Sequence, residues 1–327
     1  MKIGVIGGGA WGTALAQVAA HGGKGQHVRL WALEPEVAAA INRNHQNPLY
    51  LPNIPLSDKI VATSHLADMA DCDALLIVTP AQHLRSSIAH LPVKNVPLVL
   101  CSKGIEAGTM KLMSEVVEAV LPDAPLAVLS GPTFAHEVAK GLPTAVTLAC
   151  ADPALQQRLA ERLALPTFRT YQTDDVTGAE IGGAVKNVLA IACGVVAGLQ
   201  LGQNANAALI SRGFVEMTRF GLARGARAET LSGLSGLGDL VLTCTSTASR
   251  NFSLGKGLGE GRTAQDLMAD RRTVAEGAFT APVLQAAGHA IGVPIPITDA
   301  VCGLLDGSLT AKQAVEQLLA RPIGQEL

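Results

Sequence analysis

Aromatic side chains make up only 3% of the 327 residues, and charged side chains only 16%. So few aromatics provide no set of rings on which nucleic-acid bases could stack. The formal net charge is -2, which lacks the basic excess typical of proteins that bind polyanions. We therefore expect no nucleic-acid partner, and any phosphate bound should belong to a small molecule held at a local site.

The six cysteines are scattered, and no C-x-x-C pair occurs. The eight histidines likewise lack the H-x-H or H-x-x-x-H spacing of a metal site. We therefore predict no metal, and free thiols in a reducing compartment. Hydrophobic residues reach 48%, which excludes a mainly disordered chain.

Long hydrophobic runs are also missing. The most apolar stretch, Val188–Leu199, is shorter than the roughly 20 residues that cross a bilayer, and polar residues from Gln200 onward follow it. The apolar N-terminus contains glycines up to Gly12, which suit a turn better than the helix of a signal peptide. We expect a cytoplasmic protein with no integral membrane segment.

Short apolar runs alternate with helical patterns over the first half of the chain. Apolar runs include 2–6, 28–31, 74–78, 98–101, 126–129 and 145–148, and helical patterns include 10–20, 109–120 and 153–163. This alternation predicts a doubly wound parallel sheet of the Rossmann type, within the α/β class. Ala/Leu/Gly-rich helical patterns replace it further on. We predict a dinucleotide-binding domain over 1–177 and an all-helical substrate domain over 178–327.

A G-x-G-x-x-G motif, Gly7 to Gly12, directly follows the first predicted strand and opens a helix. In that context Gly7 permits a tight turn, Gly9 lets a pyrophosphate approach the backbone, and Gly12 allows close helix–strand packing. The helix N-terminus then faces the anion. The motif predicts binding of NAD or NADP, whereas a glycine-rich turn without a ligand is the simpler alternative.

The end of the second strand should separate NAD from NADP. Glu34 could accept a hydrogen bond from the ribose 2′-hydroxyl of NAD, or it could simply precede a helix that begins at Pro35. Leu33 offers no donor to a 2′-phosphate. Arg29 could bind that phosphate only if its side chain faced the adenosine pocket. We expect both cofactors to be used, and the sequence leaves their preference open.

Two loops follow neighbouring strands at the expected ligand edge of the sheet. Lys103 lies in the segment 102–104, and the segment 130–135 (SGPTFA) comes after the next strand. Ligands of open α/β sheets bind in the crevice at the carboxyl ends of the strands. The alternative for the second loop is an ordinary strand-to-helix turn, but two such loops at one sheet edge favour a site.

Two isolated charges mark the helical half. Lys186 is the only charged side chain between Glu180 and Arg212, and Asp239 is the only one between Glu229 and Arg250. A lysine in an apolar helix is desolvated, which favours its neutral form and suits proton exchange. A buried Asp239 needs a cationic or hydrogen-bonding partner, and Lys186 is the obvious candidate. A lysine stem packed on the core and an Asp turn are the alternatives.

A hydroxyl-rich stretch over 243–249 leads into Arg250 and Asn251. An arginine beside several hydroxyls could bind a phosphate bidentately. The alternative is a solvated polar loop.

Together these segments resemble the bacterial NAD(P)-dependent glycerol-3-phosphate dehydrogenases. The resemblance extends in order over nearly the whole chain. Its motifs are Gly7–Ala16 (GGGAWGTALA), Ser102–Gly104 (SKG), Ser130–Ala135 (SGPTFA), Gly182–Val188 (GGAVKNV), Asn204–Gly213 (NANAALISRG), Gly236–Cys244 (GLGDLVLTC), Ser249–Asn251 (SRN) and Val274–Gly277 (VAEG).

This resemblance implies hydride transfer between sn-glycerol 3-phosphate and dihydroxyacetone phosphate, which supplies glycerophospholipid synthesis. Lys186 matches the family's proton acceptor. The positions that match substrate contacts are Lys103, Gly131, Thr133, Lys186, Asp239, Ser249, Arg250 and Asn251. Those that match dinucleotide contacts are Trp11, Ala135, Arg250, Val274 and Glu276. The predicted cofactor site also includes Gly7, Gly9, Ala10, Gly12, Leu33 and Lys103. The family often carries a basic or imidazole residue where this chain has Leu33.

Two other classes remain open on the residues alone. One is a related dehydrogenase of a different hydroxy compound, such as a sugar acid or a 2-ketopantoate-type substrate. The other is a non-catalytic dinucleotide sensor, against which the costly isolated charges argue. A Gly/Ala-rich helical domain could also pair with a second copy of itself as a homodimer.

Overall fold

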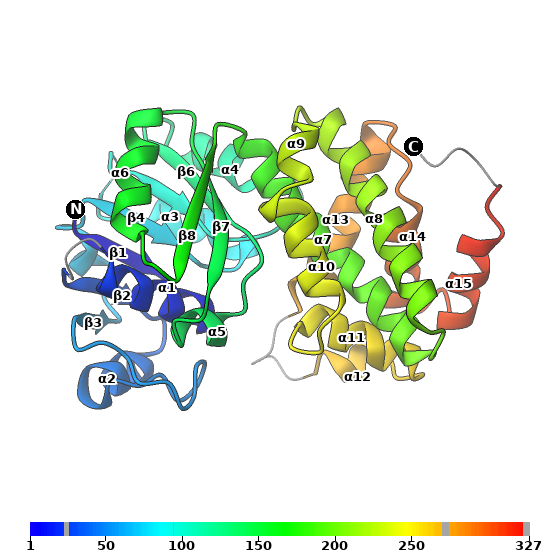
Figure 1. Ribbon diagram of the computed structural model, residues 1–327, viewed down its shortest axis with the longest axis horizontal. Helices are drawn as coiled ribbons and strands as arrows, with labels where there is room; N and C mark the ends of the chain where they lie inside the picture. Colours follow the sequence, from blue (N-terminus) through cyan, green and yellow to red (C-terminus); the bar gives the residue numbers. More distant parts are fainter. Residues whose placement is uncertain (23–25, 94, 270–274, 323–327) are drawn as a thin grey trace. The chain divides into compact units, whose positions relative to one another are not determined.

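The chain packs into two compact units in the computed structural model, which describes residues 1–22, 26–93, 95–269 and 275–322. The first unit holds Met1–Lys103 and Met113–Ala179, and the second holds Gly104–Leu112 and Glu180–Leu327. Figure 1 shows them in sequence colours, with the first unit from blue to green and most of the second from green to red. The chain therefore enters the second unit briefly, at 104–112, before it completes the first. The sequence pattern did not predict this detour.

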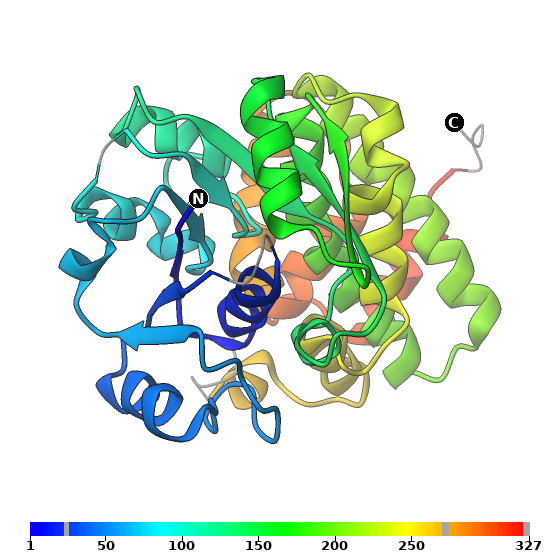
Figure 2. The ribbon, with the colours of Figure 1, turned by 60° about the vertical axis from the view of Figure 1, so that its left-hand side comes forward.

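An eight-stranded sheet forms the centre of the first unit (Figure 2). Its strands are β1 (Ile3–Ile6), β2 (Val28–Trp31), β3 (Ile60–Thr63), β4 (Ala74–Ile77), β5 (Leu98–Leu100), β6 (Leu126–Ser130), β7 (Thr144–Ala149) and β8 (Phe168–Thr173). Their order is β3-β2-β1-β4-β5-β6-β7-β8. The order reverses direction at β1, which pairs in parallel with both β2 and β4. Such a switch point opens the crevice in which doubly wound sheets bind ligands.

Helices cover both faces of this sheet. They are α1 (Ala10–His21), α2 (Pro35–Asn44), η1 (Leu66–Met69), η2 (Ala81–His83), α3 (Leu84–Ala89), α4 (Met113–Val120), α5 (Ala135–Ala139) and α6 (Pro153–Leu163). Residues of α1, α2, α5 and α6 join one apolar core with Ile3 and Val5 of β1, whereas α3 and α4 join another with Ile6. Because successive strand residues face opposite sides, a strand buried on both sides must be apolar throughout.

The predicted fold class is confirmed, with three differences in detail. Strand β7 runs antiparallel to β6, although the expected sheet was parallel. The sequence analysis missed two edge strands, β3, which is a short apolar run (IVAT), and β8, whose residues are mostly polar (FRTYQT). The helix expected over 109–120 begins only at Met113, because Ile105 and Leu112 form a bridge and bury themselves in the second unit's core.

Every named element of the second unit is helical. The helices are α7 (Val176–Gly198), whose first turn belongs to the first unit, α8 (Gln203–Ala223), α9 (Ala228–Leu231), η3 (Leu234–Gly238), α10 (Asp239–Cys244), α11 (Arg250–Gly259), α12 (Ala264–Leu267), α13 (Glu276–Ala290), α14 (Pro296–Leu305) and α15 (Ala311–Leu319). Helix α7 is the centre of their common apolar core.

By length and composition, α7 alone among the helices of the described residues could cross a membrane. However, 89% of its apolar window is buried inside the protein. Such burial is expected of a core helix that is apolar on all sides.

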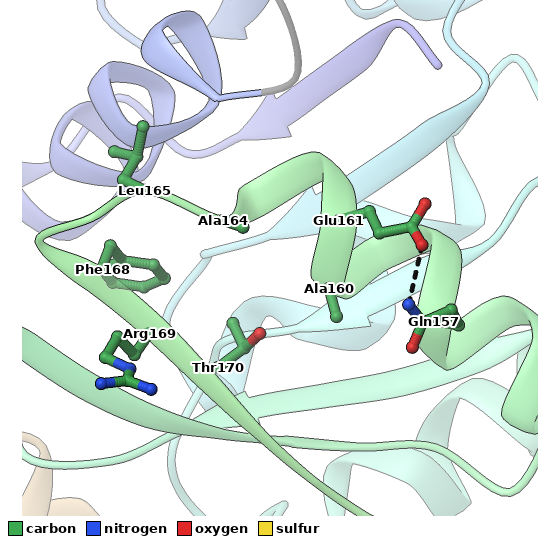
Figure 3. A pocket seen from close by; sticks show the side chains of 8 residues that line it. All are labelled: Gln157, Ala160, Glu161, Ala164, Leu165, Phe168, Arg169 and Thr170. Carbon is green, nitrogen blue, oxygen red and sulfur yellow. Dashed lines mark hydrogen bonds between the residues drawn. The ribbon is translucent and has the colours of Figure 1, made fainter.

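A shallow hollow of about 320 Å³ lies between α6 and the edge strand β8 (Figure 3). Its lining residues are Gln157, Ala160, Glu161, Ala164, Leu165, Phe168, Arg169 and Thr170. None of these lining residues belongs to the predicted site.

Candidate active site

The glycine motif forms a tight turn between β1 and α1. Gly7 has a φ of 128°, a conformation that residues with a Cβ rarely adopt. A Cβ on Gly12 would lie 1.8 Å from the Gly7 carbonyl oxygen, so only glycine permits this close packing. By contrast, a Cβ on Gly9 would meet nothing within 4 Å. Gly9 is the N-cap of α1, so open space lies in front of a helix N-terminus, as a phosphate requires.

Three buried polar atoms at the ligand edge of this unit have no hydrogen-bond partner among the described residues. They are Trp11 Nε1 in the first turn of α1, Thr79 Oγ1 just after β4, and Ser130 Oγ at the end of β6. Buried polar groups are nearly always paired. Their position at the carboxyl ends of the strands fits a polar ligand, and a dinucleotide satisfies that requirement.

The loops after β5 and β6 meet at the same edge. Lys103 Nζ donates a hydrogen bond of 3.2 Å to the Gly131 carbonyl oxygen, and Thr133 Oγ1 donates one of 3.3 Å to the same oxygen. The structure thus brings together three residues predicted to contact substrate. Ala135 begins α5 immediately afterwards and packs on the apolar core.

Just after β2, Leu33 is exposed, whereas the Arg29 side chain is bound to Asp71 and not directed to the ligand edge. Arg29 donates two hydrogen bonds, of 3.0 and 3.1 Å, to the carboxylate of Asp71, which also pairs with Lys2. Lys2 and Asp71 precede β1 and β4, so this cluster lies at the amino ends of the strands. A ligand at the carboxyl edge would therefore not reach Arg29, and Arg29 is not available to bind a 2′-phosphate.

Lys186 and Asp239 are partners in the second unit, as expected. The Lys186 Nζ lies 2.6 Å from Asp239 Oδ1 and 3.0 Å from Thr243 Oγ1. Lys186 is 7% exposed and Asp239 is completely buried. Since burial disfavours a charged lysine and the carboxylate favours it, apolar surroundings alone do not determine the charge of Lys186.

The sequence placed Thr243 in the hydroxyl-rich stretch before Arg250, but it did not predict the contact of Thr243 with Lys186. Thr243 lies one helical turn after Asp239 on α10, donates to the Asp239 carbonyl oxygen at 2.6 Å, and accepts from Lys186. The spacing of four residues from Asp239 on one helix face was the only signal for that contact.

Glycines make the Lys186–Asp239 contact possible. A Cβ on Gly182, one turn before Lys186 on α7, would lie 2.3 Å from the Ser235 carbonyl oxygen. Ser235 belongs to η3, a π-helical turn that leads directly into α10 at Asp239. Because Gly182 has no side chain, α7 approaches η3 closely enough for the two charges to meet.

Residues 245–248 form the mostly exposed polar loop considered as an alternative, whereas the segment 249–251 begins a helix. Ser249 is the N-cap of α11, and its hydroxyl accepts a hydrogen bond from the Phe252 amide. Arg250 is the exposed first residue of the helix. An arginine at a helix N-terminus is suited to hold an anion.

Asn251 is buried and joins three helices. Its Nδ2 donates to Asn187 Oδ1 on α7 at 3.0 Å, and its Oδ1 accepts from the Gly277 amide at 2.9 Å. Gly277 lies next to Glu276, the first residue of α13. Asn251 and Glu276 are thus held near the residue that follows Lys186. The predicted dinucleotide contact Val274 lies outside the described residues.

A switch-point sheet with a glycine turn, joined to a helical unit with a buried Lys–Asp pair, defines the class of NAD(P)-dependent dehydrogenases built from two such units. The family comparisons are more specific. Residues 2–156 match the model of the NAD-dependent glycerol-3-phosphate dehydrogenase N-terminus, and residues 175–316 match that of its C-terminus. The chain belongs to the NAD-dependent glycerol-3-phosphate dehydrogenase family.

Individual relatives agree over the full length. The chain is 61% identical to glycerol-3-phosphate dehydrogenase (NAD(P)+) 1 of Sphingopyxis alaskensis, covering 99% of this chain and 98% of the relative. It is 62% identical to the corresponding protein of Novosphingobium aromaticivorans, with the same coverage. The crystal structure of a glycerol-3-phosphate dehydrogenase from Coxiella burnetii superposes with a TM-score of 0.93 at 40% identity, covering 98% of this chain and 99% of that one. The predicted family is confirmed.

Proposed function

We propose that Lys186 is the catalytic residue that moves the proton in the family's reaction. The chain is an oxidoreductase that interconverts dihydroxyacetone phosphate and sn-glycerol 3-phosphate with NAD or NADP, and so supplies glycerophospholipid synthesis. The two alternatives considered from the sequence, a dehydrogenase of another hydroxy compound and a non-catalytic sensor, are thereby excluded.

The nicotinamide, when bound, supplies or accepts the hydride at C2 of the substrate. In the direction of reduction, Lys186 Nζ would give a proton to the C2 oxygen, and in the direction of oxidation it would take that proton back. Asp239 and Thr243 hold the Nζ in place, and burial keeps bulk water from it. The buried, doubly held Nζ is the observation that carries this proposal.

We infer two sets of substrate contacts, each described within its own unit. In the first unit Lys103, Gly131 and Thr133 supply a cation and a tight turn at the sheet edge. In the second, the N-terminus of α11 with Ser249, Arg250 and Asn251 would hold the phosphate, and Asp239 would orient Lys186. Arg250 provides the charge for this phosphate site.

For the dinucleotide we propose the glycine turn with Gly7, Gly9, Ala10, Trp11 and Gly12, together with Leu33, Lys103 and Ala135, and from the second unit Arg250, Val274 and Glu276. The open space at Gly9 and the unpaired Trp11 Nε1 support this assignment. On this basis 1–177 is the dinucleotide domain and 178–327 the substrate domain.

Replacing Lys186 tests the proposal. Lys186→Met should lower kcat by about 10²–10⁴-fold, the usual contribution of one acid–base group, without weakening NADH binding. The matched control is Lys312→Met, an exposed lysine on α15. Steady-state kinetics with dihydroxyacetone phosphate and a fluorescence titration with NADH give both readouts. Near-normal turnover of Lys186→Met would refute the assignment.

We also propose a cytoplasmic location without a nucleic-acid partner or an integral membrane segment, and assembly as a homodimer through the helical unit. Exposed apolar side chains on several of its helices support pairing, among them Leu222, Phe279 and Leu319. All six cysteines are buried and free, which fits a reducing compartment. Light scattering of the purified protein tests the dimer, since a monomer mass at micromolar concentration would exclude it.

A further inference from the structure

Glu34 and Tyr50 form a hydrogen-bonded pair just after β2. The Tyr50 hydroxyl donates to Glu34 Oε1 at 2.7 Å. Glu34 is the N-cap of α2, and no other hydrogen bond to its carboxylate occurs among the described residues. Oε2 therefore remains able to accept from a ligand.

The loop that carries Tyr50 is fastened to the glycine turn. Asn47 is completely buried, and its Nδ2 donates to the Gly8 carbonyl oxygen and to Thr13 Oγ1, each at 2.8 Å. The Asn47 side chain also accepts from the Tyr50 amide at 3.2 Å. Asn47 thus fixes Tyr50 relative to the phosphate-binding turn, and Tyr50 in turn fixes Glu34.

This pair lies where the adenosine ribose of a dinucleotide belongs. The Gly7 amide donates to the Trp31 carbonyl oxygen at 3.0 Å, and a Cβ on Gly8 would fall 2.5 Å from the Ala32 Cβ. The glycine turn therefore touches the end of β2, and Glu34 follows two residues beyond this contact. In the doubly wound fold, an acid at this position accepts the ribose 2′-hydroxyl.

The charge around the pair is negative. The hydrogen bond to Glu34, with burial and the charges of Glu34 and Glu36, raises the pKa of Tyr50 to about 12. Tyr50 therefore keeps its proton and remains a donor at neutral pH. Leu33 is apolar, and Arg29 is bound to Asp71 at the opposite edge of the sheet. A 2′-phosphate at this position would lie near the carboxylates of Glu34 and Glu36, and Arg29, the cation of β2, would be out of its reach.

We propose that Tyr50 locks the Glu34 carboxylate in position to accept the ribose 2′-hydroxyl, so that this pair selects NAD over NADP. The inference rests on the proposed dinucleotide site and extends it by naming the group that discriminates. Glu34 is the specificity-determining residue, and Tyr50 acts through it as a positioning residue.

Binding to the enzyme without substrate tests this directly. Fluorescence titrations with NADH and NADPH would be made on wild type, Glu34→Gln, Tyr50→Phe and the double variant. We expect wild type to prefer NADH by at least about tenfold, and Glu34→Gln to reduce that preference by about tenfold, as loss of a charge-assisted hydrogen bond implies. Tyr50→Phe should weaken NADH severalfold in wild type and have no further effect in Glu34→Gln, because it acts only through the carboxylate.

Tyr171→Phe is the matched control, since Tyr171 is exposed on β8 and is the other tyrosine of the chain. Circular dichroism of each variant shows whether it folds. Titrations with adenosine 2′,5′-bisphosphate and with AMP compare binding with and without a 2′-phosphate in ligands that lack the nicotinamide. Equal effects of Glu34→Gln on NADH and NADPH, or additive effects of the two substitutions, would overturn the proposal. If the Lys186 assignment were wrong, Lys186→Met would keep a near-normal kcat, and the preference of the wild type for NADH over NADPH would not be affected.

Discussion

At the scale of single residues, the two roles proposed for Lys186 and Arg250 coincide with different surroundings. Lys186 is buried and doubly held, which suits proton transfer, whereas Arg250 is exposed at the start of α11, which suits capture of an anion. Their surroundings differ because a proton donor gains from exclusion of water, while a phosphate has to be met by an accessible cation.

Arg250→Ala should therefore raise the KM for dihydroxyacetone phosphate by about 10-fold or more, the cost of one lost charged hydrogen bond. The nonphosphorylated analogue dihydroxyacetone should be affected much less. Steady-state kinetics with both substrates measures the difference. Equal losses would show that Arg250 does not bind the phosphate.

Asp71 provides a pH-dependent test of the cluster that holds Arg29. Hydrogen bonds from Arg29 and Lys2 lower the pKa of Asp71 to about 2. A carboxyl with a lowered pKa contributes stability above its unfolded pKa, near 3.8, and loses it as the pH falls toward 2. The Asp71 side chain is exposed, so its ion pairs with Arg29 and Lys2 contribute less than about 1 kcal/mol to the free energy of unfolding.

Asp71→Asn should thus destabilise the protein slightly at pH 6, and the difference from wild type should shrink as the pH falls to 3. Urea unfolding at several pH values measures it, with the exposed Asp123→Asn as control. The ratio of NADH to NADPH affinity should not change. If the difference in unfolding free energy between Asp71→Asn and wild type grew as the pH fell, the ion pair would not be its source.

At the scale of secondary-structure elements, the N-terminus of α14 depends on a side chain from α8. The buried Glu216 accepts hydrogen bonds from the amides of Ile297 and Thr298 and from the Thr298 hydroxyl, at 2.7 to 2.9 Å. Burial nevertheless raises the pKa of Glu216 above its ordinary value. The folded state therefore holds this proton more tightly than the unfolded chain, and stability from this group falls as the pH rises through 4.5.

Glu216→Gln should cost about 1–3 kcal/mol of unfolding free energy, because the new amide donor faces a backbone donor. Since glutamine does not titrate, the difference from wild type should narrow between pH 4 and pH 7. Denaturant unfolding measures this, with Glu260→Gln, an exposed partner of Lys256, as control. A difference that widens with pH would contradict the assigned direction of the shift.

At the scale of the whole molecule, NADH binding should raise the free energy of unfolding of the unit that binds it. Each unit has an apolar core of its own, with α1 of the first unit directly behind the open space at Gly9. Gly9 has an extended backbone conformation and an unoccupied Cβ position, so alanine fits without a clash. In the complex, that same methyl group would lie where the pyrophosphate approaches.

Gly9→Ala should leave the unliganded melting temperature nearly unchanged, at a cost of at most about 1 kcal/mol for the helix cap. NADH at 100 times its Kd should stabilise wild type by about 2.7 kcal/mol and the variant far less at the same concentration. Calorimetry with and without NADH measures both quantities. A full NADH shift in Gly9→Ala would place the pyrophosphate elsewhere.

Most of the strands, the glycine turn and the Lys186–Asp239 pair could be predicted from the sequence alone, because each depends on a local pattern of residues. Strands buried on both faces must be apolar throughout, the glycine turn needs glycine at fixed positions, and a lone lysine and a lone aspartate in apolar helices need each other. The helical second unit followed from composition in the same way. These features required no knowledge of which distant segments meet.

Only the tertiary structure decided the rest, because it depends on contacts between distant segments. The mostly polar edge strand β8 and the antiparallel direction of β7, whose apolar run was predicted, are decided by strand pairing. Arg29 reads as a candidate phosphate ligand until Asp71, 42 residues away, is seen to bind it. Tyr50 has no distinctive sequence signal, and the contacts of the Tyr50 and Thr243 hydroxyls with Glu34 and Lys186 follow only from the fold.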